Sequence, residues 1–373
     1  MSVADLLAGL GAVDVAIVGG GIAGASLAAA LAPHARVVVL EGESMPGLHA
    51  TGRSAAFWSE TYGGPAIQPL TTASGGALRD GDFLAPLGSL HIGRADDAGA
   101  AEALLAAFDG TAVDLAAVDP AAHVPGLRAG WTVGVMEPSC AYIDVARLHA
   151  HYLAAARRAR ATIVADAAIR GAERQGGGWA IDTAAGRIVA EVIVNAAGAW
   201  ADQVAVAAGA RPLGLKPYRR TMVQLRTDPP APTTMPLVVD LAGRFYFKPE
   251  SGGRLWLSPH DEVPTSPCDA QPEEIDIALA VDRFEGAVDW QVTAVERSWA
   301  GLRTFAPDRL PVYGYAERGF FWCAGQGGFG IQTAPAAAQM AASLLLGRVP
   351  DVPGVDPDRY SPARFDDKDR ASD

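Results

Sequence analysis

The sequence contains few cysteines, and their spacing fits neither a metal site nor a disulfide framework. Its 373 residues include only Cys140, Cys268 and Cys323, which lie far apart and form no C-x-x-C pair. An odd, sparse set of this kind is typical of a reducing compartment. The first residues also lack the basic segment of a secretory signal, so we expect a cytoplasmic protein.

Clusters of positive charge and long hydrophobic runs are lacking as well. Lysine and arginine number 30 against 42 aspartates and glutamates, a formal net charge of −12, and no stretch is rich in basic residues. Binding to a phosphate backbone needs a positive surface, so we do not expect nucleic acid as a partner. The most apolar stretch, residues 13–32, contains Asp14 and four glycines. We interpret it as a strand, a turn and a helix rather than a transmembrane segment.

Several catalytic signatures are missing, whereas glycine is abundant. The sequence contains no H-E-x-x-H, G-x-S-x-G or Walker motif, which excludes the usual signatures of hydrolases and nucleotidases. His149 and His151 would lie on different sides of a helix, so we expect no metal site. The 42 glycines gather at a few points without a Gly-X-Y period. At about 100–200 residues per domain, the length suggests two domains. Half of all residues are hydrophobic, which is enough to form a core in each domain.

The first glycine cluster lies between two apolar runs. Residues 14–18 and 36–40 are short β-branched runs, and a glycine-rich turn and an Ala/Leu-rich helix to about Ala32 lie between them. Two buried strands around a helix form a βαβ unit, whose parallel sheet must be covered on both faces. The sequence therefore predicts an α/β fold.

The glycine spacing of this turn is G-x-G-x-x-G, which is typical of dinucleotide-binding proteins. Its glycines permit a tight turn, close approach of the backbone to a pyrophosphate and close packing of helix on strand. The helix N-terminus then presents N–H groups to the phosphates, and an acid after the second strand can accept hydrogen bonds from both ribose hydroxyls. An acid at this position also disfavours a 2′-phosphate. The predicted cofactor-binding residues of this motif are Gly19, Gly21, Ile22, Ala23, Gly24 and Glu41.

Two further segments are candidates for the same ligand. One is the loop Thr51, Gly52, Arg53, Ser54, Ala55 and Ala56, which follows the acid at the carboxyl edge of the sheet. The other is residues 325–330, a second glycine-rich junction between a strand and a helix. A second positive helix end suits a flavin, because reduction places negative charge on the flavin N1 and C2 carbonyl.

The remaining elements are read from periodicity and turn residues. Amphipathic spacing predicts a helix at 143–160, with Val145, Leu148 and Tyr152 on one face. Further helices are expected at 272–284 and 334–346. Short strands are expected at 162–165, 168–173, 178–183, 187–194, 219–225, 236–240, 245–248, 254–258 and 319–324, those between 211 and 300 being antiparallel. We expect a flexible tail over 361–373.

Four segments are similar to the D-amino-acid oxidase superfamily of FAD enzymes. They are VDVAIVGGGIAGAS with VVVLEGE, TGRSAA, VIVNAAGAWAD, and WAGLRTFAPDRLPVYG followed by GQGGFGIQTAP. Together they extend from residue 13 to residue 335. The phrases GRSAA, RPLGLKPYRR, FYFKP and QPEEIDIA are similar to those of the bacterial D-arginine dehydrogenases within this superfamily.

The resemblance implies a Rossmann-type FAD-binding domain and a second α+β substrate domain with a mostly antiparallel sheet. We expect the first to comprise 12–64, 139–210 and 301–360, and the second 65–138 and 211–300. It also implies that Arg220 and Arg303 hold a substrate carboxylate and that Tyr62 and Tyr246 hydrogen-bond the substrate. Further cofactor contacts are implied for Ala197, Gly198, Gly327, Gly328, Phe329, Gly330, Ile331 and Gln332. The cysteine that links flavin covalently in some relatives is missing from residues 304–309, so we expect non-covalent FAD.

Two departures from the arginine enzymes bear on the substrate. Phe57 stands where those enzymes have a histidine, and Leu90 where they have a glutamate that binds the guanidinium. A buried guanidinium without a partner is costly, so we expect an apolar or aromatic side chain rather than D-arginine. The expected reaction is oxidative deamination of a D-amino acid by hydride transfer from Cα to flavin N5. It gives a 2-oxo acid and ammonia, with oxygen or a quinone as possible electron acceptors.

Three alternatives remain open at this point. The substrate could be a secondary amine of the sarcosine or glycine type, or a 2-hydroxy acid. The chain could also be a non-catalytic subunit that binds FAD.

Overall fold

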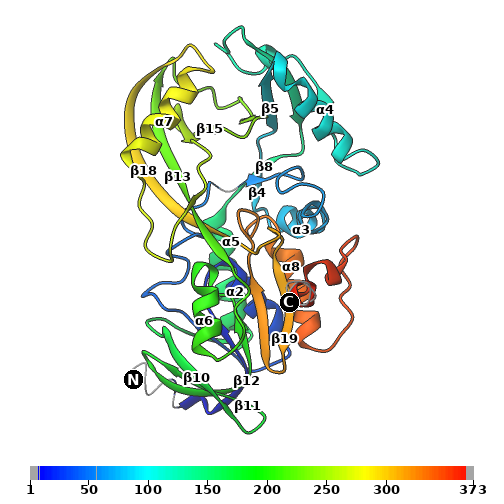
Figure 1. The fold of residues 1–373 in the computed structure, drawn as a ribbon, viewed down its shortest axis with the longest axis vertical. Helices are drawn as coiled ribbons and strands as arrows, with labels where there is room; N and C mark the ends of the chain where they lie inside the picture. Colours follow the sequence, from blue (N-terminus) through cyan, green and yellow to red (C-terminus); the bar gives the residue numbers. More distant parts are fainter. Residues whose placement is uncertain (1–6, 8, 56, 367–373) are drawn as a thin grey trace, which may run out of the picture.

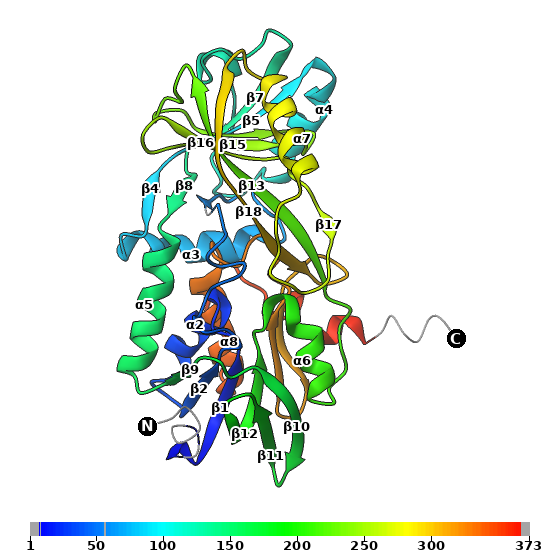
Figure 2. The same cartoon turned by 90° about the vertical axis from the view of Figure 1, so that its left-hand side faces the viewer.

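The computed structural model describes residue 7, residues 9–55 and residues 57–366. The molecule is elongated, and each half is built around its own sheet (Figures 1 and 2). The lower half in Figure 1 contains the N-terminal β1 and the strand pair β10–β11, and the upper half contains α4 and α7. The strands that precede the two glycine-rich segments, residues 12–18 and 320–324, both pair with residues 186–195 in one sheet, so these segments belong to the same half.

The first sheet has eight strands in the order β10-β11-β12-β1-β2-β9, with β20 beside β12 and β19 beside β20. Five strands of this sheet run parallel to one another: β1 (Ala12–Val18), β2 (Val37–Leu40), β9 (Thr162–Val164), β12 (Gly186–Asn195) and β20 (Phe320–Ala324). Three pair antiparallel: β10 (Ile169–Gln175), β11 (Gly178–Thr183) and β19 (Val312–Glu317). Val18 lies beside both Leu40 and Asn195, so three strands end at one edge.

Both faces of this sheet are buried, as the continuous apolar runs predict. On β1, Val15 and Ile17 face one cluster and Ala16 and Val18 face the other. The first cluster includes apolar residues of α2 (Ile22–Leu31), α3 (Gln68–Asp80), α5 (Val145–Arg158) and α8 (Ala334–Leu345). The second includes α6 (Ala201–Ala207), which follows a 3-10 turn at Gly198–Trp200. The predicted α/β fold with covered faces is confirmed.

The second sheet has nine strands in the order β17-β13-β16-β15-β14-β5-β7-β6, with β18 beside β13. Their bounds are β5 (Ser89–Arg94), β6 (Ala116–Ala117), β7 (Trp131–Glu137), β13 (Lys216–Asp228), β14 (Leu237–Asp240), β15 (Tyr246–Glu250), β16 (Arg254–Ser258), β17 (Val263–Pro264) and β18 (Gln291–Phe305). Only the β14–β5 pair is parallel. The helices of this half are α4 (Ala98–Ala107) and α7 (Glu274–Glu285).

The two faces of this sheet have different roles. Side chains alternate along a strand, so Val223 and Phe247 pack under α7, whereas Met222 and Tyr246 point to the opposite face. That opposite face contacts Phe57 from the other half of the molecule. The alternation therefore directs Tyr246 toward the junction of the two halves.

Long strands and a small sheet connect the halves. β13 and β18 pair from Lys216–Phe305 to Asp228–Gln291 and run from the upper half into the lower one (Figure 2). The small sheet has the order β3-β8-β4 and consists of β3 (Phe57–Trp58), β8 (Ala141–Ile143) and β4 (Leu84–Pro86). The loop of residues 59–64 follows β3 directly and is thus placed between the halves.

Some elements differ from those expected. α3 lies within 65–138, yet its Leu70 packs against the first sheet and its Ser74 Oγ accepts a hydrogen bond from Ala336 N of α8 at 3.1 Å. The full length of β18 was also missing from the sequence-based assignment. The residue ranges of the two domains stay a prediction, but α3 belongs with the first sheet by its contacts.

The start of the expected tail is packed rather than free. Residues 362–365 form a 3-10 turn, Phe365 is buried, and Arg364 Nε donates to Asp308 Oδ2 at 2.7 Å. The expectation of flexibility is therefore wrong for these residues, because an ion pair and a buried ring hold them. Residues 367–373 lie outside the described part of the chain. Among the described residues, no helix combines the length and apolar character needed to cross a bilayer.

Candidate active site

The glycine-rich turn after β1 has the geometry that its spacing predicts. Gly19 has a φ of +103°, and a Cβ on it would lie 2.5 Å from the carbonyl oxygen of Ala196. A Cβ on Gly24 would lie 1.9 Å from the carbonyl oxygen of Gly19. Both positions therefore exclude other residues, the first by conformation and contact and the second by the closeness of α2 to the turn.

The groups around this turn fit a nucleotide. Glu41, buried at the end of β2, accepts hydrogen bonds from Gly20 N at 2.8 Å and from Glu43 N at 2.9 Å. Thr51 Oγ1 accepts from Ile22 N at 3.0 Å at the first turn of α2. The carboxylate is thereby held beside the helix N-terminus, where it can receive ribose hydroxyls while the helix end faces the phosphates.

One continuous cavity of ≈ 410 Å³ connects this turn with the junction of the two halves. It is lined by most of the sequence-predicted residues: Gly19, Gly21, Ile22, Ala23, Glu41, Thr51, Arg53, Ser54, Ala55, Ala197, Gly198, Gly327, Gly328, Gly330, Ile331 and Gln332, together with Tyr62, Arg220, Tyr246 and Arg303. Three predicted residues, Gly24, Gly52 and Phe329, are not among its lining residues. Ala56 lies outside the described residues.

The three exceptions have structural roles. Gly24 allows α2 to approach the turn, and Gly52 N donates to the carbonyl oxygen of Gly47 at 2.9 Å. Phe329 packs its ring against those of Tyr62 and Phe305, at centroid distances of 5.1 and 5.9 Å. These contacts support the cavity wall, and contact of the three residues with the cofactor stays a prediction.

Arg53 lines the cavity, but its guanidinium is already bonded. Nη1 donates to the carbonyl oxygens of Ala270 and Ala300 at 2.8 and 3.1 Å, and Nη2 is paired with Asp269. These partners belong to the segment between β17 and α7 and to β18. Arg53 therefore joins the loop of residues 51–55 to the other half of the molecule, a role that its sequence position alone does not reveal.

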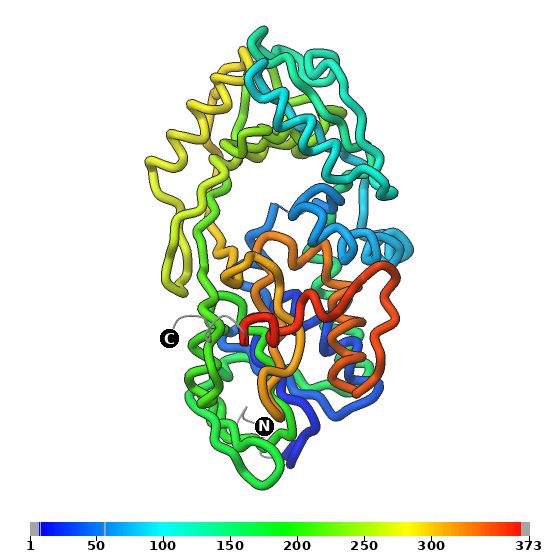
Figure 3. Tube along the Cα trace, turned by 45° about the vertical axis from the view of Figure 1, so that its right-hand side comes forward, coloured from blue at the N-terminus to red at the C-terminus, as the bar shows by residue number. Residues whose placement is uncertain are grey.

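The glycine-rich segment 325–330 lies beside the loop of residues 59–64 in the centre of the molecule, where the blue and orange parts of the tube meet (Figure 3). A Cβ on Gly328 would lie 2.2 Å from Tyr62 Oη and 2.4 Å from Arg303 Nη2. Gln332 Nε2 donates to the carbonyl oxygen of Tyr62 at 3.1 Å and to Thr71 Oγ1 at 2.8 Å. The segment is thus fitted against the residues proposed to bind substrate.

Three buried polar atoms of cavity-lining residues have no hydrogen-bond partner within the described part of the chain. They are His49 Nδ1, Arg303 Nε and Thr304 Oγ1. Buried polar groups are normally paired, so such atoms along one cavity fit a polar ligand. With the glycine turn and Glu41, they fit a flavin dinucleotide that extends from α2 to the junction.

Tyr62, Arg220, Tyr246 and Arg303 come together at the junction end of the cavity. Arg303 Nη2 donates to Tyr62 Oη at 2.6 Å, and the Arg220 Cζ lies 6.0 Å from the centre of the Tyr246 ring. Burial and the charge of Arg303 lower the pKa of Arg220, whereas burial raises the pKa of Tyr246. A buried arginine beside a second one that is 12% exposed favours binding of an anion.

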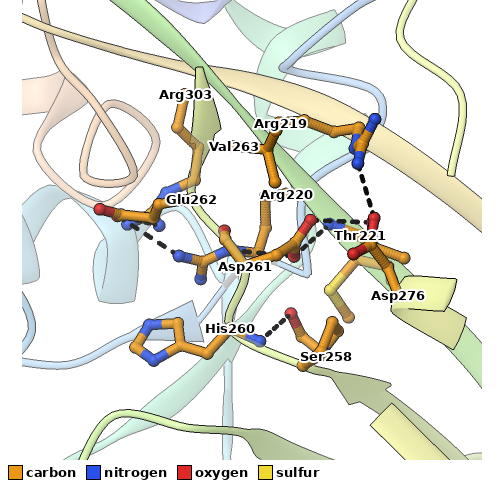
Figure 4. A network of polar contacts seen from close by, with 12 residues as sticks. Arg219, Arg220, Thr221, Ser258, His260, Asp261, Glu262, Val263, Asp276 and Arg303 are labelled. Carbon is orange, nitrogen blue, oxygen red and sulfur yellow. Dashed lines mark hydrogen bonds and ion pairs between the residues drawn. The ribbon is translucent and has the colours of Figure 1, made fainter. Parts of the chain in front are cut away.

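Glu262 is an acid at this site that the sequence did not indicate. It lies between β16 and β17 and contacts Arg220 and Arg303 (Figure 4). It also contacts Arg309. Burial opposes its ionisation, but the charges of Arg303 and Arg309 keep the pKa of Glu262 below its ordinary value. No local pattern marks a residue that pairs with arginines 41 to 47 positions away.

The position of Leu90 corrects another expectation. Its side chain is buried beneath α7 with Val223 and Val238, away from the junction. The next residue on β5, His91, faces the other half, and its Nε2 lies 3.3 Å from Thr61 Oγ1. The identity of Leu90 therefore does not describe the substrate pocket, whereas Phe57 does line the cavity.

A buried carboxyl holds the loop that carries Tyr62. Glu137 accepts hydrogen bonds from Ser59 Oγ at 2.8 Å, Thr61 Oγ1 at 2.6 Å and Glu60 N at 2.6 Å. Burial raises the pKa of Glu137 and lowers the pKa of His91 to about 4. Sequence analysis did not find this network because its members are polar residues without a recognisable spacing.

The lowered pKa of His91 predicts a specific dependence of stability on pH. In the unfolded chain a histidine takes up its proton near pH 6.5, whereas His91 in the folded protein does so only near pH 4. The contribution of neutral His91 to the free energy of unfolding is therefore complete above pH 6.5 and is lost as the pH falls toward 4. Relative to His91→Asn, the wild type should lose up to about 1.4 kcal/mol of unfolding free energy per pH unit in this window.

Urea unfolding of the two proteins at pH 7.5, 6.5, 5.5 and 4.5 measures this difference. His34→Asn, at an exposed position, is the matched control and should follow the wild type. Parallel curves for the wild type and His91→Asn would contradict the prediction.

The arrangement fits a class of protein: an oxidoreductase in which a Rossmann-type sheet binds a flavin dinucleotide and a second, mostly antiparallel sheet lies beside it. Within the described residues, no group of His, Cys, Asp or Glu side chains could hold a metal ion.

The family model named DAO, described as FAD dependent oxidoreductase, matches residues 14–344, and the chain belongs to this family. FAD is accordingly its cofactor. The chain is 28% identical over 253 residues to glycine oxidase of Pseudomonas aeruginosa, covering 65% of each. It is 27% identical over 254 residues to mitochondrial dimethylglycine dehydrogenase of Mus musculus, covering 61% of this chain and 29% of that protein. The matches thus span less than two thirds of either relative.

Solved structures show the same fold. L-proline dehydrogenase from P. horikoshii matches with a TM-score of 0.83 and 21% identity, covering 95% of this chain and 98% of that one. Glycine oxidase from Geobacillus kaustophilus matches with a TM-score of 0.81 and 24% identity, covering 94% and 98%. The resemblance to the D-amino-acid oxidase superfamily is confirmed, and the closer similarity to bacterial D-arginine dehydrogenases stays a prediction.

Proposed function

We propose that this protein oxidises a D-amino acid with an apolar or aromatic side chain to the imino acid, which water converts to a 2-oxo acid and ammonia. The observation that carries the proposal is the pair Arg220 and Arg303 beside Tyr62 and Tyr246 at the junction end of the cavity. FAD, when bound, would accept the two electrons of the Cα–H bond as a hydride. The electron acceptor that follows, oxygen or a quinone, is left open.

The chain's own residues bind and orient the substrate. A planar guanidinium can hold a carboxylate through two parallel hydrogen bonds, so Arg303 and Arg220 can fix the carboxyl end of an amino acid. Such positioning lowers the barrier by removing the need to order the substrate during the reaction. The two positive charges also disfavour an ammonium group nearby, and thus favour the neutral amine that the oxidation needs.

The side-chain preference rests on the aromatic wall of the cavity. The Phe57 ring lies 5.2 Å from that of Tyr62 and 6.2 Å from that of Tyr246. Glu262, although acidic, is already paired with three arginines and so is not available to a cationic side chain. An apolar or aromatic group therefore suits this wall better than a guanidinium.

A second candidate is oxidation of a secondary amine or a 2-hydroxy acid by the same site. Phe57 supports it, because no polar group at this position would contact a primary amine. Two relatives reported above are named for small amino acids, glycine and its N,N-dimethyl derivative. A non-catalytic FAD-binding subunit is less well supported, since the arginines and tyrosines all face the cavity.

Anaerobic titration of the FAD-loaded protein with a panel of amino acids tests the proposal. D-leucine and D-phenylalanine should bleach the visible flavin band, whereas their L-forms should not. If sarcosine or a 2-hydroxy acid bleaches the band instead, the second candidate replaces the first. None of the three cysteines lines the cavity, so the flavin should also be released by denaturation.

Removing the aromatic ring at position 57 should change the substrate preference. Phe57→Ala is expected to lower kcat/KM for D-phenylalanine and D-leucine about tenfold, because a lost apolar contact costs about 1–3 kcal/mol of transition-state binding. D-alanine, which does not reach the ring, is the matched control and should change little. Equal losses for all three substrates would show that Phe57 acts on the structure of the site and not on selectivity.

A further inference from the structure

Glu262 places a carboxylate of the protein itself on the arginines that bind substrate in the proposed function. Its Oε1 lies 3.1 Å from Arg303 Nη1 and 3.4 Å from Arg220 Nη2 (Figure 4). The same oxygen lies 2.9 Å from Arg309 Nη2. Its Oε2 lies 3.0 Å from the same nitrogen of Arg309. A single side chain thus contacts all three guanidinium groups.

The hydrogen bonds of the two cavity-lining arginines are largely in use. Arg303 gives Nη1 to Glu262 and Nη2 to Tyr62 Oη, so both nitrogens of its outer edge are engaged. Arg220 gives Nε to the carbonyl oxygen of Asp261 at 2.7 Å and Nη2 to Glu262. A carboxylate ligand that is to bind the outer edge of Arg303 through two bonds must replace Glu262 at Nη1.

The backbone around Glu262 is held in place, whereas its side chain has room to move. The Asp261 carboxylate accepts hydrogen bonds from Thr221 N and Oγ1 at 2.8 and 2.9 Å, and Val263 of β17 pairs with Arg219 of β13. The Glu262 side chain is 33% exposed and that of Arg309 50%, against 6% for Arg220 and 12% for Arg303. Arg309 therefore offers Glu262 a partner on the solvent side.

We propose that Glu262 is an internal counter-ion that competes with the substrate carboxylate for Arg220 and Arg303 and withdraws to Arg309 when a ligand binds. This inference rests on the proposed function, in which these arginines hold a carboxylate. The product of that reaction carries the same carboxylate as the substrate, so an internal competitor weakens product binding and speeds its release. Ligand affinity then depends on the fraction of molecules in which the arginines are free of Glu262.

Binding of benzoate, a carboxylate without an oxidisable amine, tests the competition. The FAD-loaded, full-length protein is titrated while the flavin absorption is recorded, and stopped flow gives the dissociation rate. Glu262→Gln should lower Kd about tenfold and slow dissociation, as expected if about one tenth of the arginine pairs are free in the wild type. Glu262→Asp, one methylene shorter, should lie between the two. Benzamide, which lacks the charge, should show no difference between these proteins.

A double-mutant cycle tests the role of Arg309. Arg309→Gln should raise Kd several-fold in the wild type, because the displaced carboxylate loses its partner, but should have no effect in the Glu262→Gln background. Glu296→Gln is the matched control, since Glu296 also pairs with two arginines but lies outside the cavity. It should bind benzoate as the wild type does.

The outcomes separate the two proposals. An unchanged or higher Kd in Glu262→Gln, with benzoate binding still abolished by Arg303→Gln, overturns the competition but leaves the arginine anchor intact. If benzoate perturbs the flavin in none of these proteins, the carboxylate anchor itself is wrong, and the inference that rests on it is overturned as well.

Discussion

Replacing Arg303 by glutamine is expected to lower kcat/KM about 100-fold or more, mainly through a higher KM. Arg303 is 12% exposed, lines the cavity and donates to Tyr62 Oη, so its charge acts in a largely desolvated setting. Truncating one partner of such a charge pair costs about 2–5 kcal/mol, and about 1.4 kcal/mol corresponds to a factor of ten. Steady-state kinetics with the D-amino acid that bleaches the flavin measures the effect.

Two further variants distinguish loss of the guanidinium from a general disturbance. Arg303→Lys keeps the charge but not the planar pair of donors, so it should recover only part of the loss. Arg297 lies on the same strand and is exposed, with its guanidinium 5.5 Å from the centre of the Trp299 ring. Arg297→Gln should therefore change kcat/KM less than about twofold. If Arg303→Gln retains FAD and wild-type KM, the carboxylate is held elsewhere.

A methyl group on Gly24 is expected to destabilise the protein and to abolish retention of FAD. The Cβ of an alanine would lie 1.9 Å from the carbonyl oxygen of Gly19 and 3.2 Å from Ile17 Cγ2, so α2 would have to move away from β1. Overpacking of this kind costs about 1–3 kcal/mol, and the shift displaces the helix end that faces the phosphates. Urea unfolding of the apoprotein and the flavin content after gel filtration measure the two effects.

Gly76 provides a control with the opposite sign. It also lies inside a helix, α3, but is exposed and a Cβ on it would meet no atom within 4 Å. Gly76→Ala should therefore raise the unfolding free energy by about 0.5–1 kcal/mol through the better helix propensity of alanine, with FAD binding unchanged. Comparable stability and flavin content in Gly24→Ala and the wild type would contradict the assigned role of Gly24.

Elements with a strong local pattern were predictable from the sequence, and those without one were not. β1, α2 and β2 follow from β-branched runs around a glycine-rich turn, and α5 follows from its amphipathic spacing. β18 carries several exposed polar residues and no regular alternation, and it is a strand because β13 pairs with it along its length. α3 has little apolar character, and contacts with α8 hold it.

The candidate site was predictable only in part, for a related reason. Gly19, Gly21 and Glu41 are close in sequence, so their spacing alone indicates the nucleotide end of the cavity. Tyr62 and Arg303 are 241 positions apart, and only the resemblance to a known family suggested that they meet. Arg53 and Gln332 line the cavity, and their side chains also bond to distant parts of the protein, which no local spacing indicates.

The βαβ unit and the nucleotide-binding turn follow from local sequence, because a tight glycine turn and a buried strand depend on neighbouring residues. The packing of distant segments sets which charged groups share the junction end of the cavity. Glu262 pairs with Arg220, Arg303 and Arg309 because β13, β17 and β18 lie side by side there. Electrostatic energy depends on distance in space and on burial, and neither can be read from positions along the chain.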